Sequence, residues 1–269
     1  MIPSPLSFPS YRSRYLPAMT AAQVAALPDK AWAPVIIGTG AIEQHGPHLP
    51  VAVDALIGQA TISMALARLP ADASCYVAPP ITIGKSNEHT GYPGTLMISK
   101  GTLRALLLAC AQQVHAWGFK AIGIVNTHGG NIGPVAYTLR EITAKYGLRA
   151  EFLHSGVQHD IPEQGRVYGY HAEETETSYL LALAERHVKA ERAVCEYSGK
   201  IGDPGELRAE RSPATFSWVT RDLCRSGVMG DALAGTKAKG QRWLPLATEG
   251  LAQAIARMSR ELKAQHGPA

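Results

Sequence analysis

The fold is decided by one apolar run and the turn that follows it, Ala121-Ile122-Gly123-Ile124-Val125-Asn126-Thr127-His128-Gly129-Gly130-Asn131. The run over residues 121–126 is typical of a central strand in a parallel sheet, because such strands are buried on both faces. The glycine-rich turn leads directly into a segment of helical character that ends near residue 146. The chain therefore passes from strand to helix across a turn that carries His128.

The same alternation of strand and helix continues on both sides of this stretch. We predict further strands at residues 34–38, 76–79 and 149–153, and further helices at residues 20–27, 55–69, 101–117, 175–186 and 247–263. Such alternation indicates an α/β fold with a mostly parallel sheet. No long linker or repeat divides the chain, so we expect a single domain over residues 1–269, with an extended arm at 1–18 and a loop-rich region at 196–245.

Composition limits the classes of protein that the sequence can encode. Hydrophobic residues make up 46% and charged residues 18% of the 269 residues, which favours an ordered chain with a sizeable core. The net charge of +4 comes without a lysine or arginine cluster, so we expect neither nucleic acid nor an acidic membrane as a partner. We find no signal peptide, no apolar run of about 18 residues and no C-x-x-C pair. We therefore expect a soluble cytoplasmic protein.

A polar segment after the predicted strand at 34–38 carries four potential metal ligands, Glu43, His45, His48 and Asp54. One glycine and two prolines make residues 46–50 a stiff loop rather than a helix. In open α/β sheets, sites lie beyond the carboxyl ends of the strands, and His128 stands at a second such end. The alternative interpretation is a polar surface loop with solvated acids and ordinary histidines.

A third segment, residues 169–178, opens a predicted helix with one histidine and three glutamates, His171, Glu173, Glu174 and Glu176. Acids at a helix N-terminus also stabilise the helix electrostatically, which explains one or two of them but not the histidine. If the three segments converge, one of these glutamates joins the ligands Glu43, His45, Asp54 and His128. Two imidazoles and three carboxylates suit Zn²⁺, Mn²⁺ or Fe²⁺, and two metal ions that share a carboxylate use five ligands economically.

The turn after the central strand also suits a substrate, because the backbone N–H groups of Gly129, Gly130 and Asn131 at a helix N-terminus can bind an oxyanion or a carboxylate. A dinucleotide-binding alternative rests on Gly38 and Gly40, but the third glycine of that fingerprint is absent. Another alternative is a degenerate, non-catalytic metal-binding or assembly protein. The presence of all five candidate ligands argues against it.

Three segments resemble the creatininase (creatinine amidohydrolase) family: residues 40–50 together with Asp54, residues 126–131, and residues 171–178. The turns at 92–95 and 227–231 are also similar to family features, and the resemblance spans about residues 20–260. It implies a three-layer α/β/α sandwich, a homohexamer, and two divalent metal ions per subunit, with zinc first and manganese or iron as alternatives. It also implies an amidohydrolase that acts on C–N bonds other than ordinary peptide bonds.

The resemblance further implies a role for each matching residue. Glu43, Asp54 and His128 would hold one metal ion. His45, Asp54 and a glutamate would hold the other, so that Asp54 bridges the two. His171 matches the proton-shuttling histidine of the family. We assign substrate binding to Ser86, His48, Gly129, Gly130, Asn131 and Tyr170.

The sequence departs from the creatinine-cleaving branch of the family, which has a metal-binding glutamate at the position of Gly130. The branch with glycine there has a glutamate in the segment at 171–178 instead. We predict Glu174 as this fifth ligand and as a catalytic residue, over Glu173 and Glu176. Glu173 stands where that branch usually has glycine, and we expect the added charge to tune substrate choice. The nearest candidate for the tryptophans of the creatinine branch is Tyr170, so we expect creatinine not to be the substrate.

The sequence therefore predicts a metal-dependent amidohydrolase that cleaves an amide, formamide or cyclic amide of a small molecule with water activated by two metal ions. Two alternatives within the family are a deformylase of a formamidopyrimidine nucleotide and a peptidase that trims a precursor peptide in mycofactocin maturation. A phosphorylated substrate would require basic residues near the pocket, and Lys85 is the one that the sequence places there.

Overall fold

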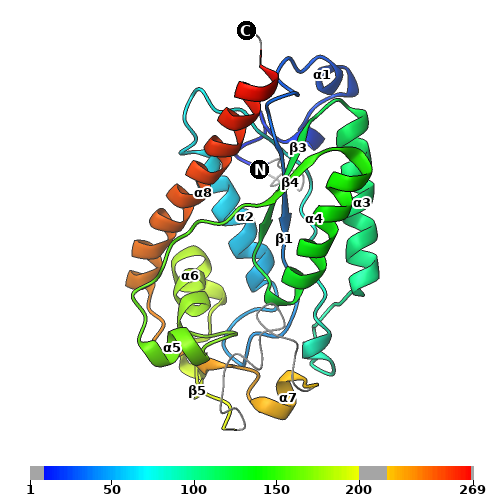
Figure 1. The fold of residues 1–269 in the computed structure, drawn as a ribbon. Helices are drawn as coiled ribbons and strands as arrows, with labels where there is room; N and C mark the ends of the chain where they lie inside the picture. The colour runs from blue at the N-terminus through cyan, green and yellow to red at the C-terminus, as the bar shows by residue number, and fades with distance from the viewer. Residues whose placement is uncertain (1–8, 200–216, 268–269) are drawn as a thin grey trace, which may run out of the picture.

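A four-stranded parallel sheet forms the middle layer of the computed structural model, which describes residues 9–199 and 217–267 (Figure 1). In the order in which they lie side by side, its strands are β2 (Tyr76–Val77), β1 (Val35–Thr39), β3 (Ala121–Asn126) and β4 (Arg149–Phe152). Neighbouring strands are all parallel. The predicted strands are confirmed, with β2 two residues shorter than expected.

Helices cover both faces of the sheet (Figure 1). On one face, α3 (Lys100–Ala116) and α4 (Ile132–Tyr146) enclose a core that includes Val35 and Ile37. On the other face, α2 (Val53–Leu66) and α8 (Lys237–His266) enclose a core that includes Ile36. Successive residues of β1 thus point into opposite cores, as the pleat of a strand requires. The predicted three-layer α/β/α sandwich is confirmed.

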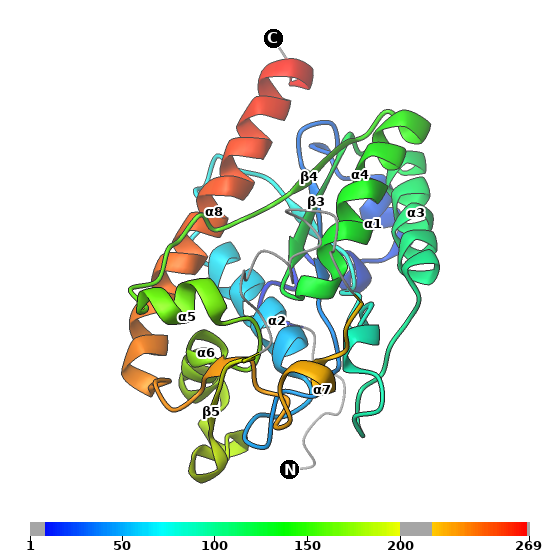
Figure 2. The ribbon, with the colours of Figure 1, turned by 60° about the horizontal axis from the view of Figure 1, so that its bottom comes forward.

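A smaller group of elements gathers at the carboxyl end of the sheet (Figure 2). It contains α5 (Glu163–Tyr168), α6 (Glu174–Ala184), α7 (Thr220–Leu223) and the antiparallel pair β5 (Cys195–Glu196) and β6 (Gly230–Asp231). A third apolar core joins α6 to α2 and α8 through residues such as Leu180, Val53 and Trp243. This core fixes α6 beside the N-terminus of α2, where Asp54 lies.

Short helical turns complete the architecture. The predicted N-terminal helix is α1 (Ala21–Ala25), and Thr20 caps it by accepting a hydrogen bond from the backbone N–H of Gln23. Of the predicted arm, residues 1–8 lie outside the described part of the chain, and Leu16 is buried in the core under α3 and α4. The 3₁₀ turns are η1 (Leu16–Ala18), η2 (Asn87–His89), η3 (Gly129–Asn131), η4 (Glu185–His187) and η5 (Ala190–Arg192).

Helix α8 begins ten residues before its predicted start, and this corrects the loop-rich assignment of residues 196–245. Thr236 caps the helix by accepting a hydrogen bond from the N–H of Lys239. In the sequence, Gly240 suggests a loop. In the structure it allows α8 to pack closely against α6, because a Cβ there would lie 2.0 Å from the carbonyl oxygen of Ser178. The region also contains β5, α7 and β6, while residues 200–216 lie outside the described residues.

Within residues 9–199 and 217–267, no helix combines the length and the apolar character needed to cross a bilayer.

Candidate metal centre

The predicted ligand residues converge where β1 and β3 end. The loop after β1 carries Glu43 and His45 and runs into α2, whose first turn holds Asp54. His128 lies two residues beyond Asn126, the last residue of β3, which pairs in register with the end of β1. Side chains from distant parts of the sequence therefore meet at one edge of the sheet, as expected for an open parallel sheet.

One group that could hold a metal ion consists of Glu43, Asp54 and His128. Nδ1 of His128 lies 3.2 Å from Oε1 of Glu43 and 3.3 Å from Oδ2 of Asp54. All three side chains are buried, with exposed fractions of 5% or less. Burial acts to raise the pKa of Glu43, but the charges and hydrogen bonds of His128 and His89 outweigh it and hold that pKa well below its usual value.

A second group that could hold a metal ion consists of His45, Asp54 and Glu176. Nε2 of His45 lies 3.4 Å from Oδ1 of Asp54 and 3.6 Å from Oε2 of Glu176. The two carboxylate oxygens of Asp54 thus face two different imidazoles, His45 and His128. This is the arrangement that a carboxylate shared by two metal ions requires.

His171 joins a third group with Glu43 and His45. Its Nε2 donates a hydrogen bond to the carbonyl oxygen of Gln44 (2.6 Å), so its Nδ1 faces Oε1 of Glu43 at 3.7 Å. The ring lies against His45 and His89, with centroid distances of 4.2 and 4.3 Å. Burial, followed by the charges of His45 and His89, lowers the pKa of His171 to about 3.

Several atoms in the cluster indicate that these residues fit a divalent cation. Oε2 of Glu43, Nε2 of His45 and Oδ2 of Asp54 are buried and have no hydrogen-bond partner within the described chain. Unpartnered buried polar atoms are costly, and a bound cation would satisfy all three. Carboxylate oxygens and imidazole nitrogens are also the donors that Zn²⁺, Mn²⁺ and Fe²⁺ accept.

The sequence model of the family described as creatinine amidohydrolase matches residues 17–255 of this chain. The chain belongs to the creatininase family. Its sequence is 33% identical over 226 residues to the mycofactocin precursor peptide peptidase of Mycolicibacterium smegmatis, covering 83% of this chain and 84% of that protein. The expected family and the expected hydrolase class are thereby confirmed.

Solved creatininase structures share the fold of this creatininase-family chain. A mutant creatininase described as the Zn–Zn type superposes with a TM-score of 0.69 at 21% identity, covering 94% of this chain and 98% of that one. A creatininase described with Mn gives a TM-score of 0.62 at 21% identity, covering 95% and 99%. At this level of identity the likeness establishes the fold alone.

Glu174, the predicted fifth ligand, belongs to none of the possible metal-binding groups among the described residues of this creatininase-family chain. Its Oε1 accepts a short hydrogen bond from Nζ of Lys239, which also donates to the carbonyl oxygen of Ala234 (2.9 Å). Glu176, two residues further along α6, points towards His45 instead. Residues two apart on a helix face different directions, so only one of the two glutamates can reach the cluster.

Glu173, expected to tune substrate choice, caps α6. Its Oε2 accepts a hydrogen bond from the backbone N–H of Thr175 (3.0 Å), and the side chain is buried. Burial, followed by the charge of Glu176, raises the pKa of Glu173 to about 7. The residue therefore has a structural role at the N-terminus of the helix that carries Glu176.

The predicted substrate-binding residues divide into exposed and enclosed positions. Gly129 is exposed, and a Cβ there would have no neighbour within 4 Å. The side chain of Asn131 is buried, donating to the carbonyl oxygen of Gly40 (3.0 Å) and accepting from the N–H of Lys85 (2.9 Å). Asn131 thus joins the loops that carry Gly40 and Lys85, and both ends of its side-chain amide are used in these hydrogen bonds.

Three further substrate-binding candidates are wholly or partly buried around the cluster. Oγ of Ser86 lies 3.3 Å from Nε2 of His128. Nε2 of His48 lies 2.9 Å from Oγ1 of Thr177, and burial, followed by the charge of His45, lowers its pKa to about 4. Tyr170 is partly buried and packs against Cys224 and Met229. Of these three, Ser86 lies beside a candidate ligand.

Gly130 is enclosed by the loop at residues 85–88. A Cβ on Gly130 would lie 2.1 Å from Oε1 of Glu88 and 2.3 Å from the carbonyl oxygen of Lys85. Glu88 pairs with Lys85 (2.8 Å) and places Oε1 at 3.5 Å from Nε2 of His128. A carboxylate from another loop therefore occupies the space beside Gly130.

Sequence reasoning did not assign His89 and Gln44 to the site. Nε2 of His89 lies 3.3 Å from Oε1 of Glu43, and Gln44 contacts both His89 and His171. The signal was present, because His89 belongs to the same polar loop as Ser86 and Gln44 stands between two predicted ligands.

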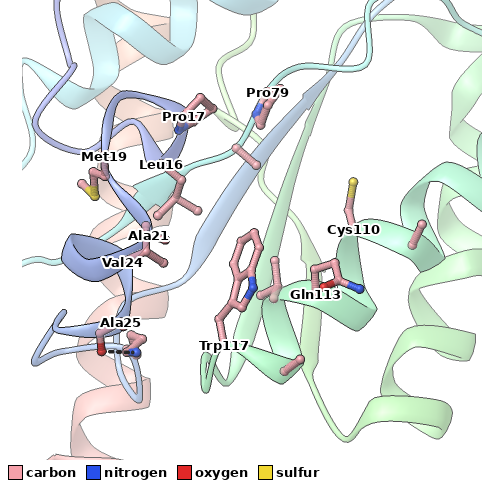
Figure 3. Close-up of a pocket in the computed structure, with 15 residues that line it drawn as sticks. Leu16, Pro17, Met19, Ala21, Val24, Ala25, Pro79, Cys110, Gln113 and Trp117 are labelled. Atoms are coloured by element: carbon pink, nitrogen blue, oxygen red, sulfur yellow. Dashed lines mark hydrogen bonds between the residues drawn. The ribbon is translucent and has the colours of Figure 1, made fainter.

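Two cavities are lined by residues outside the candidate metal centre. A cavity of about 870 Å³ between residues 16–25 and α3 is lined by apolar side chains such as Leu16, Val24 and Trp117, and by none of the candidate ligands (Figure 3). A cavity of about 380 Å³ includes Thr127, which precedes His128, and Tyr179, one turn of α6 beyond Glu176. The candidate ligands line neither of these two cavities.

Proposed function

We propose that this chain is a metal-dependent hydrolase that cleaves an amide C–N bond in a peptide. The observation that carries the proposal is the buried cluster of carboxylates and imidazoles, three of whose atoms have no hydrogen-bond partner within the described chain. The relatives named mycofactocin precursor peptide peptidase support a peptide as substrate, at 33% identity for the one from Mycolicibacterium smegmatis. The peptide replaces the small molecule that the sequence favoured.

In this proposal, Glu43, Asp54 and His128 would hold one divalent cation, and His45, Asp54 and Glu176 would hold a second. Zinc or manganese is supported by the creatininases described as the Zn–Zn type and with Mn, and iron suits the same donors. When bound, such a pair polarises a substrate carbonyl and lowers the pKa of water towards neutrality.

The proposed role of His171 is to move a proton. Because its Nε2 donates to the carbonyl oxygen of Gln44, its Nδ1 is free to accept a proton on the side of Glu43. Nδ1 takes a proton from the attacking water and returns it to the leaving nitrogen of the amide.

A two-part experiment tests the proposal. The purified chain is analysed for metal content and then incubated with a peptide library, with mass spectrometry to detect cleavage. We expect roughly two divalent ions per chain and new peptide termini, with Asp54→Ala losing both. His171→Ala should keep its metal but lose turnover by ~100-fold or more. Cleavage at the wild-type rate by metal-free protein would contradict the proposed function.

Small amides are the second candidate substrate class, because the family model is that of creatinine amidohydrolase. A parallel incubation with creatinine, formamides and a formamidopyrimidine nucleotide discriminates between the classes. We expect hydrolysis of peptides and not of these compounds. The predicted homohexamer is retained in the proposal and is tested by light scattering on the eluting protein, where a monomer would contradict it.

A further inference from the structure

His89 lies against Glu43, although the two residues are 46 positions apart in the sequence. Its side chain is buried, and its Nε2 is 3.3 Å from Oε1 of Glu43. On the other side of the ring, Nδ1 is 2.9 Å from Nε2 of Gln44. The ring could bind a metal ion through Nε2 or donate a proton from it to Glu43, and the tautomer decides between the two.

The amide of Gln44 has one orientation that satisfies its neighbours. Oε1 accepts a hydrogen bond from the backbone N–H of Gly46 (2.9 Å). Nε2 donates to the carbonyl oxygen of Gly227 (3.0 Å). Reversing the amide would place an oxygen against an acceptor and a nitrogen against a donor, so the hydrogen-bond network fixes the assignment.

This orientation determines the tautomer of His89. The second amide hydrogen of Gln44 points at Nδ1 of His89, so Nδ1 is the acceptor and carries no proton. Oγ1 of Thr220, 3.1 Å from the same nitrogen, gives its own proton to the carbonyl oxygen of Glu88 (3.1 Å). A neutral imidazole with a bare Nδ1 has its hydrogen on Nε2, the nitrogen that faces Glu43.

We propose that Gln44 and His89 act as positioning residues for Glu43. His89 donates its Nε2 hydrogen to Oε1 of Glu43 and is not a metal ligand, while Gln44 holds it in this tautomer. Oε1 is thereby engaged and Oε2, which has no hydrogen-bond partner in the described chain, is left for the cation. This inference rests on the proposed metal centre.

The first test measures the tautomer directly in the zinc-loaded wild-type protein. Histidines labelled with nitrogen-15 in the ring are observed by long-range proton–nitrogen correlation NMR, and His89 is assigned from the spectrum of His89→Gln. We expect a protonated Nε2 and a bare Nδ1. A protonated Nδ1 with Nε2 bound to zinc would overturn the inference. It would leave the proposed function intact, because that function is tested separately by metal content and peptide cleavage.

The second test measures zinc affinity by competition with a chelating dye. His89→Leu removes the donor and should weaken zinc binding by ~10-fold or more. His89→Gln keeps an N–H donor near the position of Nε2 and should bind zinc more tightly than His89→Leu. The matched control is His159→Leu, since His159 bonds to Tyr179 (2.7 Å) outside the cluster and should leave zinc affinity unchanged. Equal affinity for all of these variants would contradict the proposed role.

Discussion

Gly130 is one of the positions at which the sequence departs from the creatinine-cleaving branch that it resembles. The resemblance implies a metal-binding glutamate at this position. Here the carboxylate of Glu88 and the carbonyl oxygen of Lys85 fill the space that a side chain would need. A glutamate at position 130 would therefore displace the loop that contacts His128. The surrounding structure is compatible with glycine at this position and not with a larger residue.

Gly130→Ala should destabilise the fold, because the new Cβ would meet a backbone oxygen that cannot move aside easily. We expect a loss of about 1–3 kcal/mol in the free energy of unfolding. Gly129→Ala is the matched control, since its Cβ would meet nothing within 4 Å, and we expect no loss beyond about 0.5 kcal/mol. Urea unfolding of both variants measures the difference. Equal unfolding midpoints would show that the loop yields to the methyl group.

Four of the proposed ligands were predicted from the sequence, while the choice of Glu176 over the predicted Glu174 rests on the geometry. Glu43, His45, Asp54 and His128 follow strands whose ends must meet, so chemistry and topology agree on them. The choice between Glu174 and Glu176 depends on which way each residue faces on α6. It also depends on Lys239, 65 residues beyond Glu174, which donates a hydrogen bond to the Glu174 carboxylate. A local sequence pattern around Glu174 cannot predict a contact with a residue so distant in the chain.

Between elements, the packing of α8 on α6 explains why its start was not predicted. Gly240 and Pro245 interrupt the helical pattern, yet the helix runs through both. A Cβ on Gly240 would lie 2.0 Å from the carbonyl oxygen of Ser178 and 2.8 Å from Cβ of Ala182. The glycine is needed for close approach of two helices, which overrides its low helix propensity.

Gly240→Ala tests this competition between propensity and packing. Alanine favours a helix by about 1 kcal/mol over glycine, whereas overpacking costs about 1–3 kcal/mol. Because the obstruction is backbone, we expect packing to dominate and the variant to unfold at a lower urea concentration. Gly133→Ala in α4, where a Cβ meets nothing within 4 Å, should stabilise the protein by up to about 1 kcal/mol. Stabilisation by both substitutions would refute the packing argument.

For the whole molecule, metal removal should lower the stability of the fold. Without cations, the buried carboxylates of Glu43 and Asp54 keep unpartnered oxygens. A ligand that binds the folded state alone stabilises it by about 2.7 kcal/mol when its free concentration is about 100-fold above Kd. We expect a thermal midpoint several degrees higher with zinc than with a chelator.

The control for this measurement is Asp54→Asn, which keeps the shape of the side chain but removes the charge that both proposed sites share. Its thermal midpoint should respond little to zinc. An identical midpoint for the wild-type protein with zinc and with chelator would argue against a structural contribution of the metal.

Much of the overall architecture could be predicted because β1 and β3 are apolar runs and helices such as α4 and α8 have an amphipathic face. Strand β3 matches its predicted bounds, residues 121–126. The contacts that close the site could not be predicted, since His89 reaches Glu43 through a loop with weak periodicity. Sequence periodicity specifies which face of an element is buried, but not which distant side chain it meets.

The hydrogen bond between Gln44 and Gly227 joins residues that are 183 positions apart. During synthesis, the loop that carries Glu43 and His45 leaves the ribosome long before Gly227 is made. Glu176 and Thr220 are also translated well after that loop. A nascent chain thus contains Glu43 and His45 before the residues that will surround them have been made. The complete cluster forms only after most of the chain has been synthesised. If the proposed centre binds metal, the complete site would therefore be available to it only late in synthesis.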